Sequence, residues 1–435
     1  MAFSDKPLQS TYKSSAYLQV NKPSWFTHTP PFIVKREAGA ERFTTSLNIE
    51  DYKITPTTTY YVSNTGSSGN TGLTSDSPKG DVDQAIALGN ASGAPYEIRV
   101  AEGTYHRNRD WTSTPTQDCN IIGEGSGAVL SAQEDGLSFT LTSSNTYTTN
   151  RSNVASVYDH DYIDGFGNAK RLKKVTSQAE CEATAGTWAQ VGSALYIHAH
   201  DDRNLATSYG GMKAYLKVNS PKISDDVHVY LENLHMEGFQ TTCFEARNNG
   251  SGQTPELYMN TVSLKYCYNG NGMSLNGVSL YVGQNIVTGE NWLDGLNYHS
   301  RAGVVPIVYE IGVRHYNNGR SGESNTNGTT IHDGSAAIRV DVFSTGAGRA
   351  VHDVSNGSQS WNVDVRVGDS NTSVAEKGAA FANGTTSGDT SLMQLDYCGA
   401  IEGQCPFDLL AENGSTTYLN NTSLPNRSGT GTVVE

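Results

Sequence analysis

The chain is short of basic residues and of long hydrophobic runs, and each shortage excludes a class of protein. It has 30 basic against 44 acidic residues, a formal net charge of −14. Such a chain lacks the basic stripe that offsets phosphate repulsion, so we expect no nucleic-acid partner. No stretch approaches the roughly 18 apolar residues of a membrane span. The sequence therefore predicts no membrane insertion.

Cysteine pairs and metal-binding motifs are also missing. The six cysteines are scattered and form no C-x-x-C pair: Cys119, Cys181, Cys243, Cys267, Cys398 and Cys405. Cys398 and Cys405 are close enough to suggest a disulfide or thiol ligands, but buried reduced thiols are the commoner outcome. Neither an H-E-x-x-H motif nor a D-x-D-x-D-G loop is present. We expect no metal and no cofactor.

The first residues, MAFSDKPLQSTYKSS, do not resemble a secretion signal. A Sec signal has a basic segment followed by an apolar core, and neither is found here. Unpaired cysteines fit a protein that folds in a reducing compartment. The sequence therefore predicts a protein made in the cytoplasm and released by lysis.

What the chain does have is a repeat of short strands. From residue 229 onward, segments of alternating apolar and polar residues recur about every 23 to 30 residues. They begin at Val229, Leu257, Leu280, Tyr309, Ile338, Trp361 and Ser391. No helical pattern intervenes, and a repeat of this length carried by strands is typical of a solenoid. The sequence therefore predicts an all-β solenoid.

Three regions flank or interrupt this repeat. Residues 1–57 are rich in proline with little alternation, which indicates an extended arm that docks on another body; a disordered leader is the alternative. Residues 133–220 break the period and predict a loop excursion with a short helix near 178–185. Residues 417–435 form a polar tail. The solenoid domain is thus expected over 58–416.

Several pieces of the early sequence form a recognisable series. They are YYVS and GLT…SP after Tyr60, the helix DQAIAL with Asp81 as its cap, the strand RVAEGTY and the turn IIGEG. Together they resemble the opening of right-handed parallel β-helix proteins of the pectate-lyase-like superfamily. GTWAQVGSALYIHAHDD (Gly186–Asp202) resembles a hairpin insertion common in such proteins. The resemblance spans about residues 58–420 and implies a single-stranded β-helix, an N-terminal capping helix and a bias toward polysaccharide substrates.

Placing the coils in register predicts a column of outward-facing residues. Equivalent residues of successive coils stack about 4.8 Å apart in a parallel β-helix. Apolar residues should face inward, and the residue after each should face outward. The predicted outward column is Glu245, Ser274, Asn297, His332, His352 and Ala382. Beside it at the turns, or flanking the same coils, lie Asp294, Tyr298, His299, Asp333, Arg339, Arg349 and Asp353.

This patch suggests two reactions on a sugar polymer. Asp294, Asp333 and Asp353, with His332, are the candidate catalytic residues. Carboxylates one and two coils apart would lie about 5 and 10 Å apart, which brackets the separations of retaining and inverting glycosidases. In the alternative, a β-elimination, a histidine removes a proton and arginines neutralise the enolate.

The remaining patch residues are candidates for substrate binding. They are Glu245, Asn297, Tyr298, His299, Arg339, Arg349 and His352. A purely structural interpretation stays open, because Asp and His at strand–turn junctions often bind turn amides or stack in ladders. Strand tyrosines likewise pack against one another as well as against sugars.

The extended arm, the absent signal and the His/Asp face together look like a bacteriophage tailspike. This resemblance implies a homotrimeric virion protein that binds a bacterial surface polysaccharide, capsule or O-antigen, and attaches through its arm to a phage tail or baseplate protein. The short polar tail departs from the pattern, since a trimerising C-terminal domain is usually larger. We predict depolymerisation by hydrolysis or elimination. The alternatives are a non-catalytic receptor-binding or structural tail protein and a secreted polysaccharide lyase.

Overall fold

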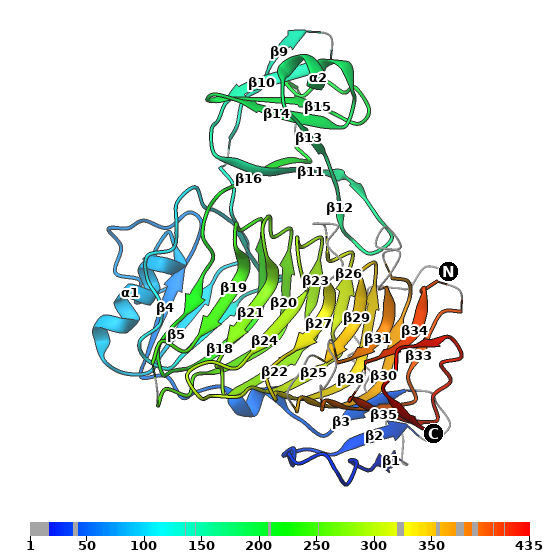
Figure 1. Ribbon diagram of the computed structural model, residues 1–435. Coiled ribbons are helices and arrows are strands. Elements are labelled where there is room, and N and C mark those ends of the chain that lie inside the picture. Colours follow the sequence, from blue (N-terminus) through cyan, green and yellow to red (C-terminus); the bar gives the residue numbers. More distant parts are fainter. Residues whose placement is uncertain are drawn as a thin grey trace.

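In the computed structural model, the chain forms a parallel β-solenoid with an excursion on one side and an arm along its outer surface (Figure 1). The structure describes residues 17–435 except 38–41, 135, 144, 208–209, 251, 320–325, 354–356, 371–377, 385–389, 403 and 413. The first 16 residues of the predicted arm therefore lie outside the described residues. The predicted all-β solenoid is confirmed.

The coils contribute strands to two long parallel sheets. The first contains β4 (Thr58–Val62), β5 (Tyr96–Val100), β6 (Gly103–His106), β7 (Cys119–Gly123), β8 (Ala128–Ser131), β18 (His228–Glu237), β20 (Glu256–Lys265), β22 (Leu280–Gln284), β23 (Val287–Gly289), β25 (Ile307–Ile311), β26 (Arg314–Tyr316), β28 (Ala336–Thr345), β30 (Gln359–Val367), β32 (Leu392–Asp396), β33 (Gly399–Ala400), β35 (Thr416–Asn420) and β37 (Thr432–Val434). The second contains β17 (Lys222–Ile223), β19 (Thr242–Arg247), β21 (Asn271–Asn276), β24 (Leu296–His299), β27 (Asn327–Ile331), β29 (Arg349–Asp353), β31 (Ala379–Asn383), β34 (Phe407–Ala411) and β36 (Arg427–Ser428).

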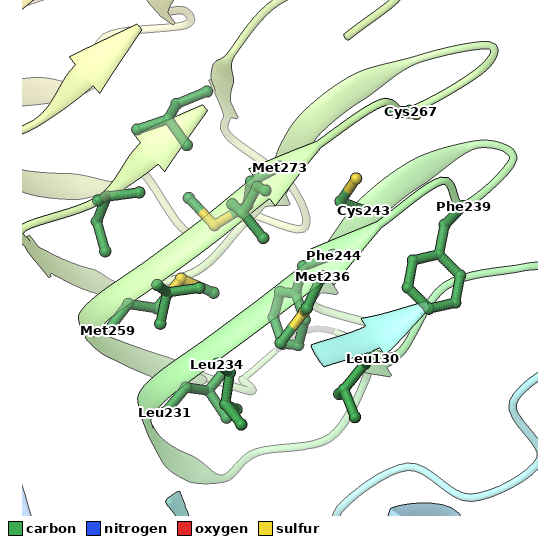
Figure 2. Packing of buried hydrophobic residues seen from close by; sticks show 14 of the residues in the cluster. Leu130, Leu231, Leu234, Met236, Phe239, Cys243, Phe244, Met259, Cys267 and Met273 are labelled. Atoms are coloured by element: carbon green, nitrogen blue, oxygen red, sulfur yellow. The ribbon is translucent and has the colours of Figure 1, made fainter. Parts of the chain in front are cut away.

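Alternation along each strand builds the solenoid interior. In β18, Val229 and Leu231 are buried inside and pair in register with Leu257 and Met259 of the next coil. Figure 2 shows apolar side chains of these coils filling the space between the sheets. Because equivalent residues stack, each coil buries the apolar surface of its neighbours, as expected for a solenoid.

The first sheet bends once in each coil, at a residue with left-handed backbone. Asn233, Thr261, Asn285, Asp341 and Asp364 all have φ between 53° and 56°. Asn and Asp enter this region more easily than most residues, which explains their recurrence at the corner. The bend divides the sheet into two faces, one carrying β22 and β25 and the other β23 and β26.

The predicted helix near the start of the solenoid is confirmed as α1 (Val82–Ser92). Asp81 caps it by accepting a hydrogen bond from the backbone N–H of Asp83, and Gly93 ends it in the left-handed conformation at φ 66°. Its apolar side chains join the main core beside β4 and β5, at one end of the stack (Figure 1).

From residue 17 on, the arm docks on the chain's own solenoid. It forms a small antiparallel sheet of β1 (Tyr17–Val20), β2 (Val34–Glu37) and β3 (Phe43–Thr45), followed by a 3-10 turn at Ile49–Tyr52. Its buried side chains cover the outer face of the first sheet, where Phe32 packs on Tyr309 with ring centroids 4.9 Å apart. Over these residues the arm therefore docks in cis, because that face of the solenoid is itself apolar.

The excursion at 133–220 contains two small sheets and a helix. One sheet is formed by β11 (Val154–Ile163), β12 (Ala169–Arg171) and β16 (Met212–Leu216). The other is formed by β9 (Thr140–Ser143), β10 (Thr146–Asn150), β13 (Lys173–Val175), β14 (Thr187–Val191) and β15 (Ala194–His198), with α2 (Gln178–Ala183) beside it. β14 and β15 are the hairpin that the sequence predicted.

Beyond residue 416 the chain continues the stack. β36 pairs with β34 and β37 with β35, both in parallel, so the polar tail forms a further coil. Leu419 and Leu424 provide its buried apolar contacts. All six cysteines are free and buried, as the reduced-thiol interpretation predicted. Within the described residues, neither helix is long and apolar enough to cross a membrane.

Candidate functional site

The outer face of the second sheet carries most of the predicted column. Glu245 pairs with Ser274, Ser274 with Asn297, and farther along His352 pairs with Ala382. The prediction is wrong at one coil, where Thr330 and not His332 stands between Asn297 and His352. The register differs by two residues because Thr329, a polar residue, takes the inward position that the sequence assigned to Ile331.

Five predicted residues form a connected cluster on this face, which we call the histidine cluster: Asp294, Asn297, His299, His332 and Asp333. Asn297 Nδ2 donates to Asp294 Oδ2 at 2.8 Å and lies 3.5 Å from His332 Nε2. The ring of His332 stacks on that of His299, with centroids 3.9 Å apart. His299 Nδ1 lies 3.3 Å from Asp333 Oδ2. The shift of two residues therefore moves His332 beside His299 of the preceding coil.

Asp294 forms the buried end of the cluster and is 4% exposed. Its Oδ1 accepts from the backbone N–H of Asn327 at 2.7 Å, and its Oδ2 accepts from Asn297 and from the Thr330 hydroxyl at 2.9 Å. Burial raises the pKa of this carboxyl, while these hydrogen bonds act in the opposite direction. Asp294 therefore positions Asn297 and Thr330 and makes little contact with solvent.

The two imidazoles of the cluster differ in their surroundings. Burial, and then the neighbouring His299, lower the pKa of His332 to about 4, so its ring is neutral near pH 7. The side chains of His299 and Asp333 are 39% and 40% exposed. A neutral imidazole thus lies against an accessible imidazole that has a carboxylate partner. Such a pair can accept a proton at one ring and donate one from the other.

Three other predicted residues lie inside the solenoid, so their expected outward orientation is wrong. Tyr298, Arg339 and Asp353 are each 0% exposed. Arg339 Nη1 donates to Asp353 Oδ1 at 3.2 Å, and its Nε lies 3.4 Å from Oε2 of Glu310. The hydroxyl of Tyr298 donates to Glu310 Oε1 at 2.9 Å. We call Glu310, Arg339 and Asp353 the interior triad.

The alternation of the strands explains this inward placement. Arg339 lies between Ile338 and Val340 on β28, and both of these apolar residues face outward under the arm. Asp353 pairs in register with Ile331, which pairs with Tyr298, so all three occupy one inward column. The polar groups of Tyr298 and Asp353 occur in this column because Glu310 and Arg339 face it from the other sheet.

The last three predicted residues lie near the cluster without belonging to it. His352 is outward in register yet 0% exposed, and its Nδ1 lies 3.3 Å from Arg349 Nη1. Burial and then Arg349 hold the pKa of His352 well below its usual range. Arg349 itself is 5% exposed. Glu245 lies two coils before Asn297 and has its closest cation, Arg247, at 3.8 Å.

Sequence reasoning missed the two residues that complete the hydrogen bonding of Asp294. Thr330 and Asn327 belong to β27, one coil beyond Asp294, and both donate to its carboxylate. Correct register at β27 would have placed Thr330 next to Asn297. Among the described residues there is no group of His, Cys, Asp or Glu side chains arranged to hold a metal ion.

No protein-family model matches the chain, and no curated protein sequence is significantly similar to it. Among solved structures it is similar to a glycoside hydrolase, with a TM-score of 0.53 and 10% identity over 87% of this chain and 96% of that one. It is also similar to a pectate lyase (TM-score 0.36, 10% identity, 87% and 80% covered). A third structure is the tailspike of an Acinetobacter baumannii bacteriophage in complex with capsular saccharide (TM-score 0.21, 10% identity, 81% and 66% covered). At such identities the first of these supports the fold alone.

Proposed function

We propose that the protein cleaves a bacterial surface polysaccharide by acid–base catalysis at the histidine cluster. The observation that carries this proposal is the stacked pair of His332 and His299, in which one ring is neutral and the other has Asp333 as its partner. A sugar polymer lying along the outer face of the second sheet meets hydroxyl, amide and carboxylate groups from successive coils. Ser274, Asn276 and Asn297 are such groups.

In this proposal His332 takes a proton from the water that attacks the sugar in hydrolysis, or from the carbon α to a uronate carboxylate in elimination. His299, with Asp333, donates a proton to the leaving oxygen as its bond to the sugar breaks. Both hydrolysis and β-elimination need such a pair. Elimination additionally needs a cation for the enolate, and the burial of Arg339 and Arg349 removes the two arginines that the sequence offered. Asp353 is buried as well, so it cannot serve as one of the two carboxylates in a hydrolytic mechanism. The imidazoles of His299 and His332 are therefore the central groups in either reaction.

The test is the release of reducing ends from purified capsule or O-antigen. We expect His332→Ala and His299→Ala to lower the rate by about 10²- to 10⁴-fold, the usual contribution of general acid–base groups. Lys222→Gln, at the far end of the same sheet, is the matched control and should keep full activity. Unchanged activity in both histidine variants would remove the cluster from the mechanism. Ultraviolet absorbance of an unsaturated product identifies elimination.

A second candidate function is binding without cleavage. It is favoured by the state of Asp294, whose two oxygens are both occupied by donors from the protein. Asp333 is then the accessible carboxylate among the five cluster residues, whereas most glycoside hydrolases use two. Retention of the polysaccharide with no release of reducing ends in the unmodified protein would favour this alternative.

We also propose the finer identity of a phage tailspike: a right-handed β-helix with α1 as its cap, a homotrimer in the virion, and attachment to a tail or baseplate protein through residues 1–57. The support is the resemblance of the early coils and the free cysteines. Light scattering coupled to size exclusion tests the trimer. A monomer at micromolar concentration would contradict it.

A further inference from the structure

A hollow lies between the excursion and the solenoid, away from the histidine cluster. The β11–β12 hairpin reaches from the excursion toward the coils that carry β23 and β26 (Figure 1). Its tip is fixed there: Lys265 Nζ donates to the carbonyl of Gly167 at 3.1 Å, and Asn317 Nδ2 donates to Asp164 Oδ2 at 3.0 Å. The space left beneath the hairpin has a volume of about 480 Å³. Such a volume accommodates a small ligand.

Two cations of this hollow have no ion-pair partner. Lys170 and Arg171 both line it, and within the described part of the chain neither forms an ion pair with a carboxylate. Each lies instead over an aromatic ring: Lys170 Nζ is 5.6 Å from the centroid of Tyr162, and the Arg171 guanidinium is 5.2 Å from that of Trp292. In a chain with a net charge of −14, two cations without carboxylate partners in one lining favour an anionic ligand.

The lining of the hollow also contains two carboxylates, those of Asp164 and Glu290. Both oxygens of Asp164 are occupied within its own turn and by Asn317: Oδ1 accepts from the backbone of Phe166 at 2.8 Å, and Oδ2 accepts from Asn317. Glu290, the other acidic lining residue, is 3% exposed. The ionisable groups of the lining are therefore two cations and two carboxylates. A ligand is drawn to the cations because Glu290 is buried and both oxygens of Asp164 already accept hydrogen bonds.

A buried amide oxygen in the lining also lacks a donor. Asn168 is 1% exposed; its Nδ2 donates to Asp164 at 3.3 Å, but among the described residues nothing donates to its Oδ1. This oxygen packs against Gly289 and is closed to solvent, so it is an unsatisfied acceptor that a ligand in the hollow does not reach.

We infer that this hollow binds an anionic sugar unit, with its acidic group on Arg171 and Lys170 and a ring face on Tyr162. The guanidinium fork fits either a carboxylate or a phosphate. Tyr162, which is 37% exposed, presents the aromatic face that sugar rings pack against. The site is separate from the histidine cluster, but Glu290 and Asp294 stand in the same turn of one coil, between β23 and β24. One polymer can thus contact both, and the inference itself does not require cleavage.

Calorimetric titration of the full chain tests this site, with trigalacturonate as the carboxylate probe and galactose 6-phosphate as the phosphate probe. We expect at least one probe to bind and the methyl ester of trigalacturonate to bind about tenfold more weakly or not at all. Arg171→Gln and Lys170→Gln should each weaken the bound probe about tenfold, equivalent to about 1.4 kcal/mol. Lys173→Gln is the matched control, since this exposed lysine begins β13 outside the hollow, and it should leave affinity unchanged.

A cluster variant separates this inference from the proposed function. His332→Ala leaves the hollow intact, so it should keep the affinity for the probe whatever happens to polysaccharide cleavage. If His332→Ala abolished binding of the probe and Arg171→Gln did not, the probe would bind at the histidine cluster, and the inference would be overturned. The absence of binding by both probes, or equal affinities for the acid and its ester, would overturn it as well.

Discussion

Two sets of ionisable residues in neighbouring coils lie on opposite sides of the second sheet, one inside the solenoid and one outside. The interior triad of Glu310, Arg339 and Asp353 is fully enclosed, and each of its charges has a partner of opposite sign within 3.4 Å. The histidine cluster lies outside, where His299 and Asp333 remain accessible and pair at 3.3 Å. An unpaired charge inside the solenoid is costly, so each charge of the triad needs a partner. An exposed charge on the outer face does not. The second sheet therefore separates residues that determine stability from residues available for chemistry.

The largest expected effect comes from removing the balancing charge of the interior triad. Arg339→Met leaves Glu310 and Asp353 buried without their cation, so we expect the free energy of unfolding to fall by about 3–5 kcal/mol. Denaturant unfolding followed by circular dichroism measures it. Adding Glu310→Gln and Asp353→Asn removes the uncompensated charge and should recover much of the loss. If Arg339→Met were as stable as the parent, Arg339 would not be the group that stabilises the two buried carboxylates.

The next largest loss of stability is expected at Asp294, the buried carboxylate of the histidine cluster. Asp294→Asn replaces one acceptor oxygen by a donor that faces Asn327 or the side chains of Asn297 and Thr330. An unsatisfied buried polar group costs about 1–3 kcal/mol, and we expect a loss of that size in the free energy of unfolding. A shift below about 0.5 kcal/mol would contradict the positioning role of Asp294.

Asp333→Asn should separate chemistry from stability on the outer face. Asp333 has a left-handed backbone at φ 57°, which asparagine also adopts readily, and its side chain is 40% exposed. We therefore expect the free energy of unfolding to stay within about 0.5 kcal/mol. Reducing-end release should still fall, because His299 loses its carboxylate partner. If Asp333→Asn kept full activity, catalysis would depend on His299 and His332 without the Asp333 carboxylate.

The effect that is smallest at neutral pH, and that grows on acidification, is a dependence of stability on pH that both faces share. Burial lowers the pKa of interior His315 to about 3 and that of His332 to about 4, both below the ordinary value of about 6.5. The unfolded chain then binds more protons between these values, so stability is complete above about pH 6.5 and declines toward pH 4. His332→Gln should flatten this decline in unfolding experiments, and His315→Gln should flatten it further. An unchanged slope in both variants would contradict the burial of these rings.

The repeat was readable from the sequence because its apolar residues follow the period of a strand. Leu231 and Met259 are inward and apolar, and their neighbours stack as the alternation predicts. Arg339 and Asp353 were not readable, because alternation assigns a polar residue to the outside by default. Their partner Glu310 comes from a different strand, and no local pattern joins the three.

The histidine cluster was readable in part. Asn297, His299 and Asp294 were grouped correctly by coil, but the position of His332 depended on whether Thr329 or Ile331 pairs with Leu296. Thr329 faces inward because its hydroxyl donates to Glu310 at 2.6 Å, a contact within the interior network. The hollow beneath the β11–β12 hairpin depends on long-range docking of the excursion, which has no signature in the local sequence.

The arm changes how the molecule carries a mechanical load. Coils of a solenoid contact only their neighbours, so an isolated stack can be peeled from either end. Here Trp25 stacks on Tyr418 of a late coil at 5.3 Å, and Tyr52 stacks on Tyr258 of an early coil at 4.5 Å. The arm therefore connects coils that lie far apart along the stack. A pull on the N-terminus reaches the late coils first and must break these aromatic contacts before the early coils bear any strain.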